Sequence, residues 1–201
     1  AHIAERIALI AQLSSSDVVF EIGPGTGKLT RELLQKAGRV IALEADEELF
    51  QALQTTFASE ISQRKLELVR GDIRVFGISA LPEKYALVAN IPYYLTGEIF
   101  RMFLASSNQP SSMTLLVQKE VAERIARSSK ESILSLSVKA YGTPKYEFEV
   151  PRGAFTPAPK VDSAALTIRD ISRKNFTTRD QEELFFRFLH AMQFLQLEQS
   201  S

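Results

Sequence analysis

The sequence predicts an α/β fold built on a mostly parallel sheet with an antiparallel strand near its C-terminal end. Short apolar runs alternate with stretches of helical periodicity over residues 1–130, and this alternation is typical of crossover connections between parallel strands. The apolar runs lack a period of two, as expected of strands that helices cover on both faces. After residue 130 the pattern changes, because residues 146–150 alternate as an antiparallel strand does.

The spacing of apolar residues and the positions of glycines predict the helices and strands of the N-terminal half. Ile3, Ile7 and Ile10 recur at helical spacing. The run 18–22 enters a glycine cluster and indicates a buried strand, and Gly38 ends the helix that follows it. The predicted helices of this half are 2–13, 28–36 and 46–58, the last opened by acidic residues that suit a helix N-terminus, and the predicted strands are 18–22, 39–44, 65–70 and 85–89.

The C-terminal half continues with helices and strands and then changes character. Its predicted helices are 96–105, 119–127 and 132–140, and its predicted strands are 113–117, 146–150 and 164–169. Residues 171–177 have the composition of a linker, and Thr178 to Gln181 form a capping box that opens a last helix. We therefore expect one domain over residues 1–170, followed by a linker and the start of a further helical region over residues 171–201.

Composition excludes several classes of function. The formal net charge is zero, which argues against a protein that binds polyanions through bulk charge. Without cysteine there are no disulfides and no thiolate-held metals, and a reducing cytoplasm is permitted. The two histidines, His2 and His190, disfavour a histidine-based metal site or a Ser-His-Asp triad, so we expect no metal. No apolar run reaches the roughly 18 residues needed to span a bilayer.

A glycine-rich turn joins the first strand to the second helix. Residues 21–30 read EIGPGTGKLT. A phosphate-binding P-loop is excluded because Leu29 follows Gly27-Lys28, and a dinucleotide fingerprint is excluded because the third glycine comes one position early. The turn could still be a tight strand-to-helix connection with no ligand.

Two acids follow the next strands of the predicted sheet. Glu44 ends the second strand and Asp72 follows the third. A carboxylate at the first position can accept hydrogen bonds from both ribose hydroxyls, and one at the second can accept from the exocyclic amine of adenine. Alone, each acid could be a solvated strand-end residue. Together with the glycine turn they lie at the carboxyl ends of successive parallel strands, and they predict an adenosine-containing ligand without a pyrophosphate.

The stretch at residues 87–94, LVANIPYY, ends a predicted strand on an amide, a proline and two tyrosines. With EIGPGTGKLT, LEADEEL, RGDI, ANIPYYLTGEIF, LLVQKEVAERI, LSVKAYG and FTPAPKVDSAAL, it resembles the ribosomal RNA adenine N6-dimethyltransferase family. The resemblance covers residues 1 to about 190. It implies a Rossmann-like class I methyltransferase fold, S-adenosyl-L-methionine as cofactor and small-subunit ribosomal RNA as substrate.

The resemblance also assigns residues to roles. It implies catalytic roles for Asn90, Pro92, Tyr93 and Phe155. It implies cofactor contacts from Gly23, Gly25, Gly27, Glu44, Ala45, Asp72, Ile73 and Asn90. RNA contacts are expected from Lys119, Arg124, Arg152 and Lys160, although a solvated charged face mixed with Glu120 and Glu123 explains such basic residues equally well.

The chemistry can be argued from these side chains. The lone pair of the adenine amine is delocalised, so an acceptor for each amine hydrogen would favour a nucleophilic nitrogen. The Asn90 oxygen is one candidate, and the backbone carbonyl of Ile91 or Pro92 is the other, so positioning and electrostatics replace a strong base. Tyr93 offers a face to the extruded base, and by resemblance Phe155, stiffened by Pro157 and Pro159, covers the other face. Ordinary packing is the alternative for both rings.

Other activities stay open at this stage. The alternatives are a large-subunit RNA methyltransferase of the erythromycin-resistance type, a catalytically silent RNA-binding relative and a small-molecule methyltransferase. Relatives carry a glutamine-containing segment before residue 1 and a basic helical domain after the last helix, so the chain is expected to be truncated at both ends and its cofactor affinity to be affected. The resemblance further implies a monomeric, cytoplasmic enzyme with no membrane contact.

Overall fold

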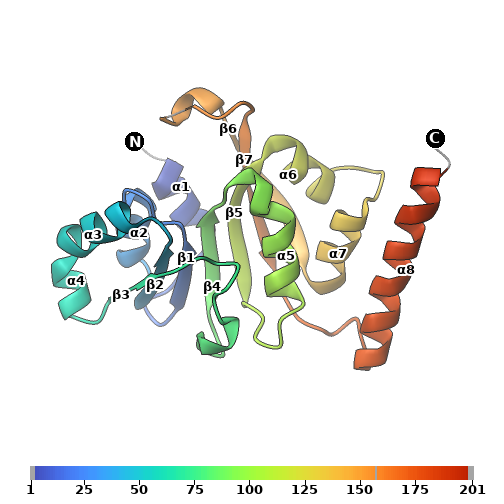
Figure 1. Cartoon of the computed structure of the whole chain (residues 1–201), viewed down its shortest axis with the longest axis horizontal. Coiled ribbons are helices and arrows are strands. Elements are labelled where there is room, and N and C mark those ends of the chain that lie inside the picture. Colours follow the sequence, from blue (N-terminus) through green and yellow to red (C-terminus); the bar gives the residue numbers. More distant parts are fainter. Residues whose placement is uncertain (1–2, 157, 199–201) are drawn as a thin grey trace.

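The computed structural model describes residues 3–156 and 158–198, with the side chains of residues 190 and 192–198 left out. A seven-stranded sheet of order β3-β2-β1-β4-β5-β7-β6 runs through the molecule (Figure 1). The strands are β1 (Val18–Ile22), β2 (Arg39–Glu44), β3 (Leu66–Arg70), β4 (Ala86–Asn90), β5 (Ser112–Gln118), β6 (Thr143–Val150) and β7 (Ser163–Arg169).

Helices cover both faces of this sheet. The helices are α1 (Ile3–Ile10), α2 (Lys28–Leu34), α3 (Glu47–Thr56), α4 (Ala58–Ser62), α5 (Thr96–Leu104), α6 (Lys119–Ala126), α7 (Ile133–Tyr141) and α8 (Arg179–Glu198), with single 3-10 turns at η1 (Ile78–Ala80), η2 (Tyr93–Leu95) and η3 (Arg152–Ala154). One core cluster joins the sheet to α5, α6 and α7, and the other joins it to α1, α2 and α3. Alternate residues of β1 enter opposite clusters, since Val19 belongs to one and Phe20 to the other.

The pairing confirms the predicted α/β fold. Strands β3, β2, β1, β4 and β5 are parallel neighbours, whereas β7 pairs antiparallel with both β5 and β6. β7 therefore runs opposite to the other six strands, and it lies between β5 and β6 although it follows β6 in sequence. Because β7 runs opposite to its neighbours, its first residue, Ser163, lies beside Gln118 at the carboxyl end of β5.

The predicted single helix over residues 46–58 is wrong beyond Thr56. Phe57 leaves the helical region with φ −112° and ψ 26°, and α4 begins after it. The Phe57 ring is buried, and a Cβ added to Gly27 would come within 2.5 Å of its Cε2 atom. The chain turns at Phe57, and its ring packs into the space left by the missing side chain of Gly27.

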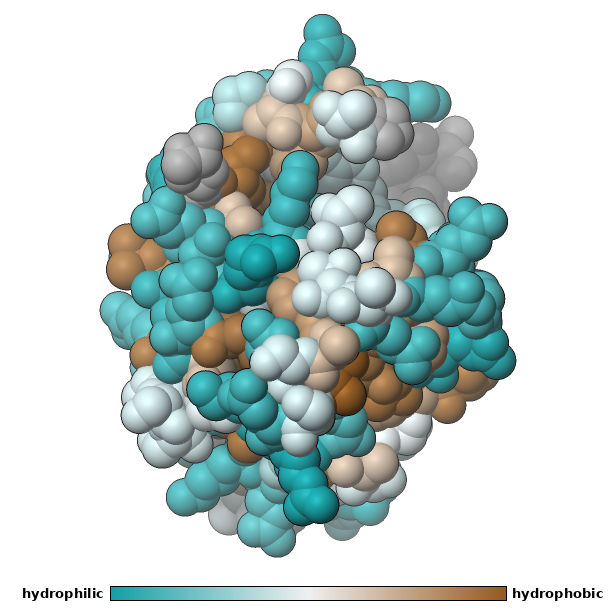
Figure 2. Space-filling model, turned by 90° about the vertical axis from the view of Figure 1, so that its left-hand side faces the viewer, coloured by the Kyte–Doolittle hydropathy of each residue, from teal (hydrophilic) through white to brown (hydrophobic). Residues whose placement is uncertain are grey.

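Strand β3 forms one edge of the sheet and carries charged side chains. Arg39 of β2 pairs with Glu67 of β3, and Arg70 of β3 pairs with Glu47 of α3. At this end of the molecule hydrophilic side chains prevail and apolar ones are scattered among them (Figure 2). Charges on an edge strand oppose pairing with a strand of another molecule.

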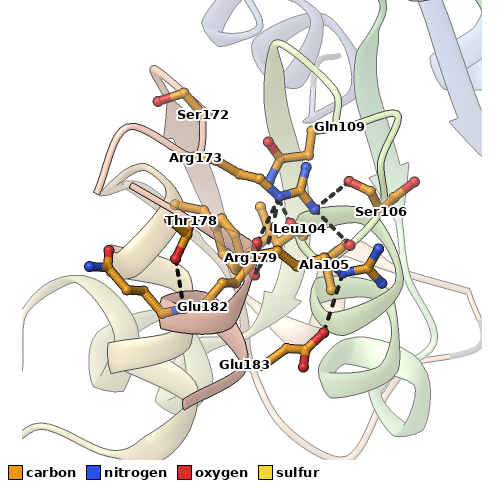
Figure 3. Close-up of polar contacts among 12 residues, drawn as sticks. Leu104, Ala105, Ser106, Gln109, Ser172, Arg173, Thr178, Arg179, Glu182 and Glu183 are labelled. Carbon is orange, nitrogen blue, oxygen red and sulfur yellow. Dashed lines mark hydrogen bonds and ion pairs between the residues drawn. The ribbon is translucent and has the colours of Figure 1, made fainter. Parts of the chain in front are cut away.

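The segment predicted as a linker packs against the body of the protein. Arg173 donates from Nη2 to the carbonyls of Ala105 and Ser106 at 2.8 Å each, beyond the C-terminus of α5, and from Nε to Glu182 of α8 at 3.1 Å (Figure 3). The Tyr141 hydroxyl of α7 also donates to Glu182. These contacts fix the first turns of α8 against the body of the protein. Within the described residues no helix is both long and apolar enough to cross a bilayer.

The capping box that predicts the start of α8 is present with a shifted partner. The Gln181 backbone N–H donates to the Thr178 hydroxyl at 3.3 Å, as expected. The Gln181 side-chain oxygen accepts from the backbone N–H of Thr177, at 2.9 Å, instead of from that of Thr178. Both bonds satisfy backbone donors at the helix start, so the predicted boundary holds.

A carboxyl group lies inside the core at the end of β1. Glu21 is fully buried, and its register neighbours are Ala42 of β2 and Val88 of β4. Neither of its carboxyl oxygens has a hydrogen-bond partner among the described residues. Burial raises the pKa of Glu21 to about 8; the neighbouring Thr30 hydroxyl lowers it by a smaller amount, and the negative charge of Glu44 raises it further. Glu21 is therefore neutral at physiological pH.

We expect Glu21→Gln to remove a pH dependence of the unfolding free energy. Between about pH 4.5, the ordinary pKa, and about pH 8 the folded protein keeps a proton that the unfolded chain has lost. The wild-type stability should therefore be complete below this window and fall across it, with a slope approaching about 1.4 kcal/mol per pH unit. Urea unfolding at several pH values measures this slope.

A matched control uses an exposed glutamate. Glu83→Gln should keep the wild-type slope, because Glu83 lies at the surface. Parallel stability profiles for wild type and Glu21→Gln would show that Glu21 is ionised in the folded protein.

Candidate functional site

The glycine turn leaves its backbone open at two positions. Gly23, Gly25 and Gly27 have φ of 66°, 58° and 77°, which L residues with a side chain rarely adopt. A Cβ added to Gly23 or Gly25 would meet no atom within 4 Å, so open space lies beside both. Gly27 is buried against Phe57 and Leu53 and has a packing reason of its own. Its predicted cofactor contact stays a prediction.

Glu44 fastens this turn to the end of β2. Its carboxylate oxygens accept from the backbone N–H of Gly25 at 3.0 Å and from that of Asp46 at 2.9 Å. Asp46 in turn caps α3 by accepting from the Leu49 N–H at 2.9 Å. Since a carboxylate offers about four acceptor positions, Glu44 retains capacity for the predicted ribose hydroxyls. The predicted contact Ala45 is exposed between these two capping acids.

Asp72 is held by a neighbour that sequence reasoning missed. Its oxygens accept from the Arg74 backbone N–H at 2.9 Å and from the Arg74 Nε at 3.1 and 3.0 Å. The hydrogen bonds from Arg74 lower the pKa of Asp72 to about 2. The pKa of Arg74 is raised in turn, chiefly by its hydrogen bond to Asp72 and to a smaller extent by Tyr94 and Glu98. An adenine amine would therefore share Asp72 with Arg74, while the predicted neighbour Ile73 is buried beneath.

The Asn90 corner projects from the end of β4. Asn90 is exposed in register with Leu116 of β5, and its side chain has no partner among the described residues. Ile91 is buried and anchors the corner in the core. The Pro92 carbonyl already accepts from the Leu95 N–H at 2.9 Å. Of the two carbonyls predicted as the second acceptor, that of Ile91 is therefore the better candidate.

Tyr93 is tied to the loop that carries Phe155. Its hydroxyl lies 2.8 Å from the Ser163 hydroxyl and donates to the Val161 carbonyl at 3.3 Å. These residues close the loop over residues 151–162, so the structure brings together two motifs that are about 70 residues apart in the chain. The antiparallel course of β7 produces this juxtaposition, because it starts β7 at the edge where β4 ends.

Phe155 is only partly exposed. Its ring packs against the core cluster that contains Val150 and Ala165. The packing alternative therefore applies to part of this side chain, and its predicted place over the target base stays a prediction. Pro159 lies in the described part of the loop, whereas Pro157 lies outside the described residues.

The four predicted RNA contacts fall into two pairs. Lys119 forms an ion pair with Glu149 at 2.8 Å, and Arg124 pairs with Glu120. Arg152 and Lys160 are exposed on the loop with Phe155, and neither side chain forms an ion pair with a described carboxylate, although the Arg152 backbone N–H donates to the Asp162 carboxylate at 2.8 Å. The Arg152 guanidinium donates to the Lys160 carbonyl at 3.4 Å, so the two positions are adjacent. Free positive charge therefore lies on this loop and is largely neutralised on α6.

A large cavity lies away from this edge. It has a volume of about 1280 Å³ and lies between α5, α7 and the first turns of α8, with Phe100, Tyr141 and Phe186 in its lining. Among the described residues no group of three or more His, Cys, Asp or Glu side chains could hold a metal ion. None of the predicted site residues lines this cavity, so the prediction concerns the carboxyl edge of the sheet and not this hollow.

Relatives with known names and structures share both sequence and fold. The chain is 42% identical over 174 residues to "Ribosomal RNA small subunit methyltransferase A" of Dehalococcoides mccartyi, which covers 83% of the chain and 57% of the relative. A dimethyladenosine transferase structure from Plasmodium falciparum matches with a TM-score of 0.77 and 31% identity, over 88% of this chain and 64% of that one. The 23S rRNA methyltransferase ErmE matches with a TM-score of 0.80 and 28% identity, over 93% and 74%.

The chain thus spans little more than half the length of the first of these relatives. The profile of the family described as ribosomal RNA adenine dimethylase matches residues 1–196, nearly the whole sequence. The fold agrees with that match, since it superimposes on the dimethyladenosine transferase structure with a TM-score of 0.77. The chain belongs to the ribosomal RNA adenine dimethylase family.

Proposed function

We propose that this chain is the catalytic part of a cytoplasmic, monomeric enzyme that dimethylates the N6 amine of adenine in small-subunit ribosomal RNA, with S-adenosyl-L-methionine as donor. Residues 1–170 form the methyltransferase unit in this proposal, and residues 171–201 form a linker and the start of a helical region. The small-subunit substrate is supported by the name of the relative that is 42% identical.

The observation that carries the proposal is the contact between Tyr93 and Ser163. It joins the amide corner after β4 to the loop with Phe155, Arg152 and Lys160. An unpartnered amide, an aromatic ring and free positive charge thus surround one point at the carboxyl edge of the sheet. These groups suit a purine base extruded from RNA, with the basic side chains near its phosphates.

The donor set beside this corner fits the adenosine cofactor. Open backbone at Gly23 and Gly25 lets a ligand approach the main chain, and the Glu44 carboxylate has acceptor capacity beside it. Asp72 provides a further acceptor that it shares with Arg74. When bound, S-adenosyl-L-methionine supplies an electrophilic methyl group on a sulfonium centre.

The chain's own residues orient the target amine of adenine. The Asn90 side-chain oxygen and the Ile91 carbonyl accept the two amine hydrogens, which directs the nitrogen lone pair toward the donor side. A strong base is unnecessary, because the amine becomes acidic only as it acquires positive charge. Fixed dipoles that need no reorganisation lower the barrier, and burial of Ile91 holds the corner in place.

A large-subunit substrate is the second candidate. The structural match to ErmE, described as a 23S rRNA methyltransferase, has a TM-score of 0.80. The shared fold does not distinguish between the two substrates. The sequence identity to ErmE, 28%, is below the 42% identity to the small-subunit relative, so the small-subunit substrate is preferred.

The test of the function is a methylation assay with labelled donor. The protein is incubated with unmodified small subunits, with large-subunit RNA, or with neither, and the labelled nucleotide is mapped. We expect label on adenine N6 of small-subunit RNA only. Label confined to large-subunit RNA would favour the second candidate, and label on neither RNA would refute both.

Asn90→Ala should abolish methyl transfer with little effect on folding. Loss of one fixed polar group around a reacting centre costs about 10²-fold or more in kcat. The side chain is exposed and unpartnered among the described residues, so the midpoint of urea unfolding should stay close to that of wild type. Near-normal turnover in single-turnover assays would remove Asn90 from the mechanism.

Substitutions at Tyr93 separate its ring from its hydroxyl. Tyr93→Ala removes a stacking face worth about 1–3 kcal/mol, so kcat/KM for RNA should fall roughly 5- to 150-fold. Tyr93→Phe keeps the ring and loses only the hydroxyl's bonds to Ser163 and Val161, so it should retain most of the activity. Ser163→Ala is the matched control and should behave like Tyr93→Phe. An equal loss in Tyr93→Phe and Tyr93→Ala would assign the role to the hydroxyl.

A further inference from the structure

Glu21 lies beneath the glycine turn and has no role in the proposed chemistry. Only Ile22 separates it from Gly23 in the sequence, and Thr30 of α2 lies beside it. Its side chain faces the same side of the sheet as Val19, the side covered by α1, α2 and α3. It is thus the buried acid next to the predicted cofactor edge.

The surroundings of Glu21 offer its ionised form little compensation beyond the nearby Thr30 hydroxyl. Both of its oxygens and the Thr30 hydroxyl are buried without hydrogen-bond partners among the described residues. Its neighbours in register on β2 and β4 are Ala42 and Val88, and the charged group that acts on it is Glu44, which is negative. Such orphaned groups are costly and rare in folded proteins, and strongly perturbed acids gather at functional sites.

We propose that Glu21 is the buried counter-charge for the cationic cofactor on the glycine turn, neutral when the cofactor is absent and ionised when it is bound. The step is a simple proton release: the carboxyl O–H bond breaks, the carboxylate keeps the electron pair, and the proton passes to the solvent. This inference rests on the proposed function, since it needs a cationic ligand at this edge.

Charge explains the direction of the coupling. S-adenosyl-L-methionine carries a sulfonium and an ammonium against one carboxylate, whereas S-adenosylhomocysteine has lost the sulfonium charge. A cation near a buried acid favours its ionised form, and the effect is strong where water is excluded. Glu21 would therefore stabilise the donor more than the spent product, and it would regain its proton as the product forms.

Calorimetric titration tests this coupling. Each of the two ligands is titrated into the 201-residue chain at about pH 7 in phosphate and in Tris, whose different ionisation enthalpies report the protons released. For wild type we expect release approaching one proton with S-adenosyl-L-methionine and a smaller release with S-adenosylhomocysteine. For Glu21→Gln we expect no release, and a preference for donor over product reduced about tenfold for each pKa unit of coupling.

The outcomes separate this inference from the proposed function. Binding of the donor without proton release, or equal release from wild type and Glu21→Gln, would overturn the inference alone. Glu83→Gln, at an exposed position, is the control and should release protons as wild type does. A second measurement needs no ligand: the ¹³C shift of the Glu21 carboxyl, assigned by comparison with Glu21→Gln, should be that of a neutral acid at about pH 6. An ionised shift there would also overturn the inference, and absence of binding heat with both ligands would count against the proposed function.

Discussion

The candidate site depends on one carboxylate that takes two backbone hydrogen bonds. Glu44 is 6% exposed, and its oxygens accept from Gly25 on one side and from Asp46 on the other. It thus fixes the glycine turn after β1 to the start of α3 after β2. Together with the bonds from the Gly23 N–H to the Leu43 carbonyl and from the Gly27 N–H to the Pro24 carbonyl, at 2.9 Å each, it holds a turn of three glycines at positive φ, which matters because glycine loses more conformational freedom on ordering than other residues. The same acid therefore shapes the turn and retains acceptor positions for a ligand.

Strand direction extends this edge into a two-sided site. The parallel strands β1, β2 and β4 place the glycine turn, Glu44 and Asn90 at their carboxyl ends. The antiparallel strand β7 then starts at that same edge and brings its preceding loop to Tyr93. The basic side chains near this edge differ in their ion pairs. Lys119 on α6 forms an ion pair with Glu149, whereas the side chains of Arg152 and Lys160 on the loop form no ion pair with a described carboxylate. The loop beside the corner therefore carries two basic side chains without an ion pair, together with Asp162, whose carboxylate accepts from the Arg152 backbone N–H at 2.8 Å.

Much of this fold could be predicted from the sequence, because the signals are local. Apolar runs and caps predict the strands to within a few residues, and the Thr178 capping box predicts where α8 begins. What escaped prediction depends on contacts between distant segments. The break at Phe57 reflects its ring packing against Gly27, the position of β7 between β5 and β6 depends on long-range pairing, and Arg74 became visible only through its bonds to Asp72. Motif spacing shows which residue types share an edge, but not which of them are already paired.

The two glutamates near the turn show why residue type alone does not determine a role. Glu44 and Glu21 are both buried, and they lie on neighbouring strands. Glu44 receives two backbone N–H groups, whereas Glu21 receives none and has a pKa raised to about 8 by burial. A buried acid with donors can keep its charge, whereas burial without them favours the protonated form. The negative charge of Glu44 raises the pKa of Glu21 further, so ionisation of one acid disfavours ionisation of the other. The hydrogen bonds that each carboxyl group receives, and not its residue type or burial alone, therefore distinguish these two neighbouring glutamates.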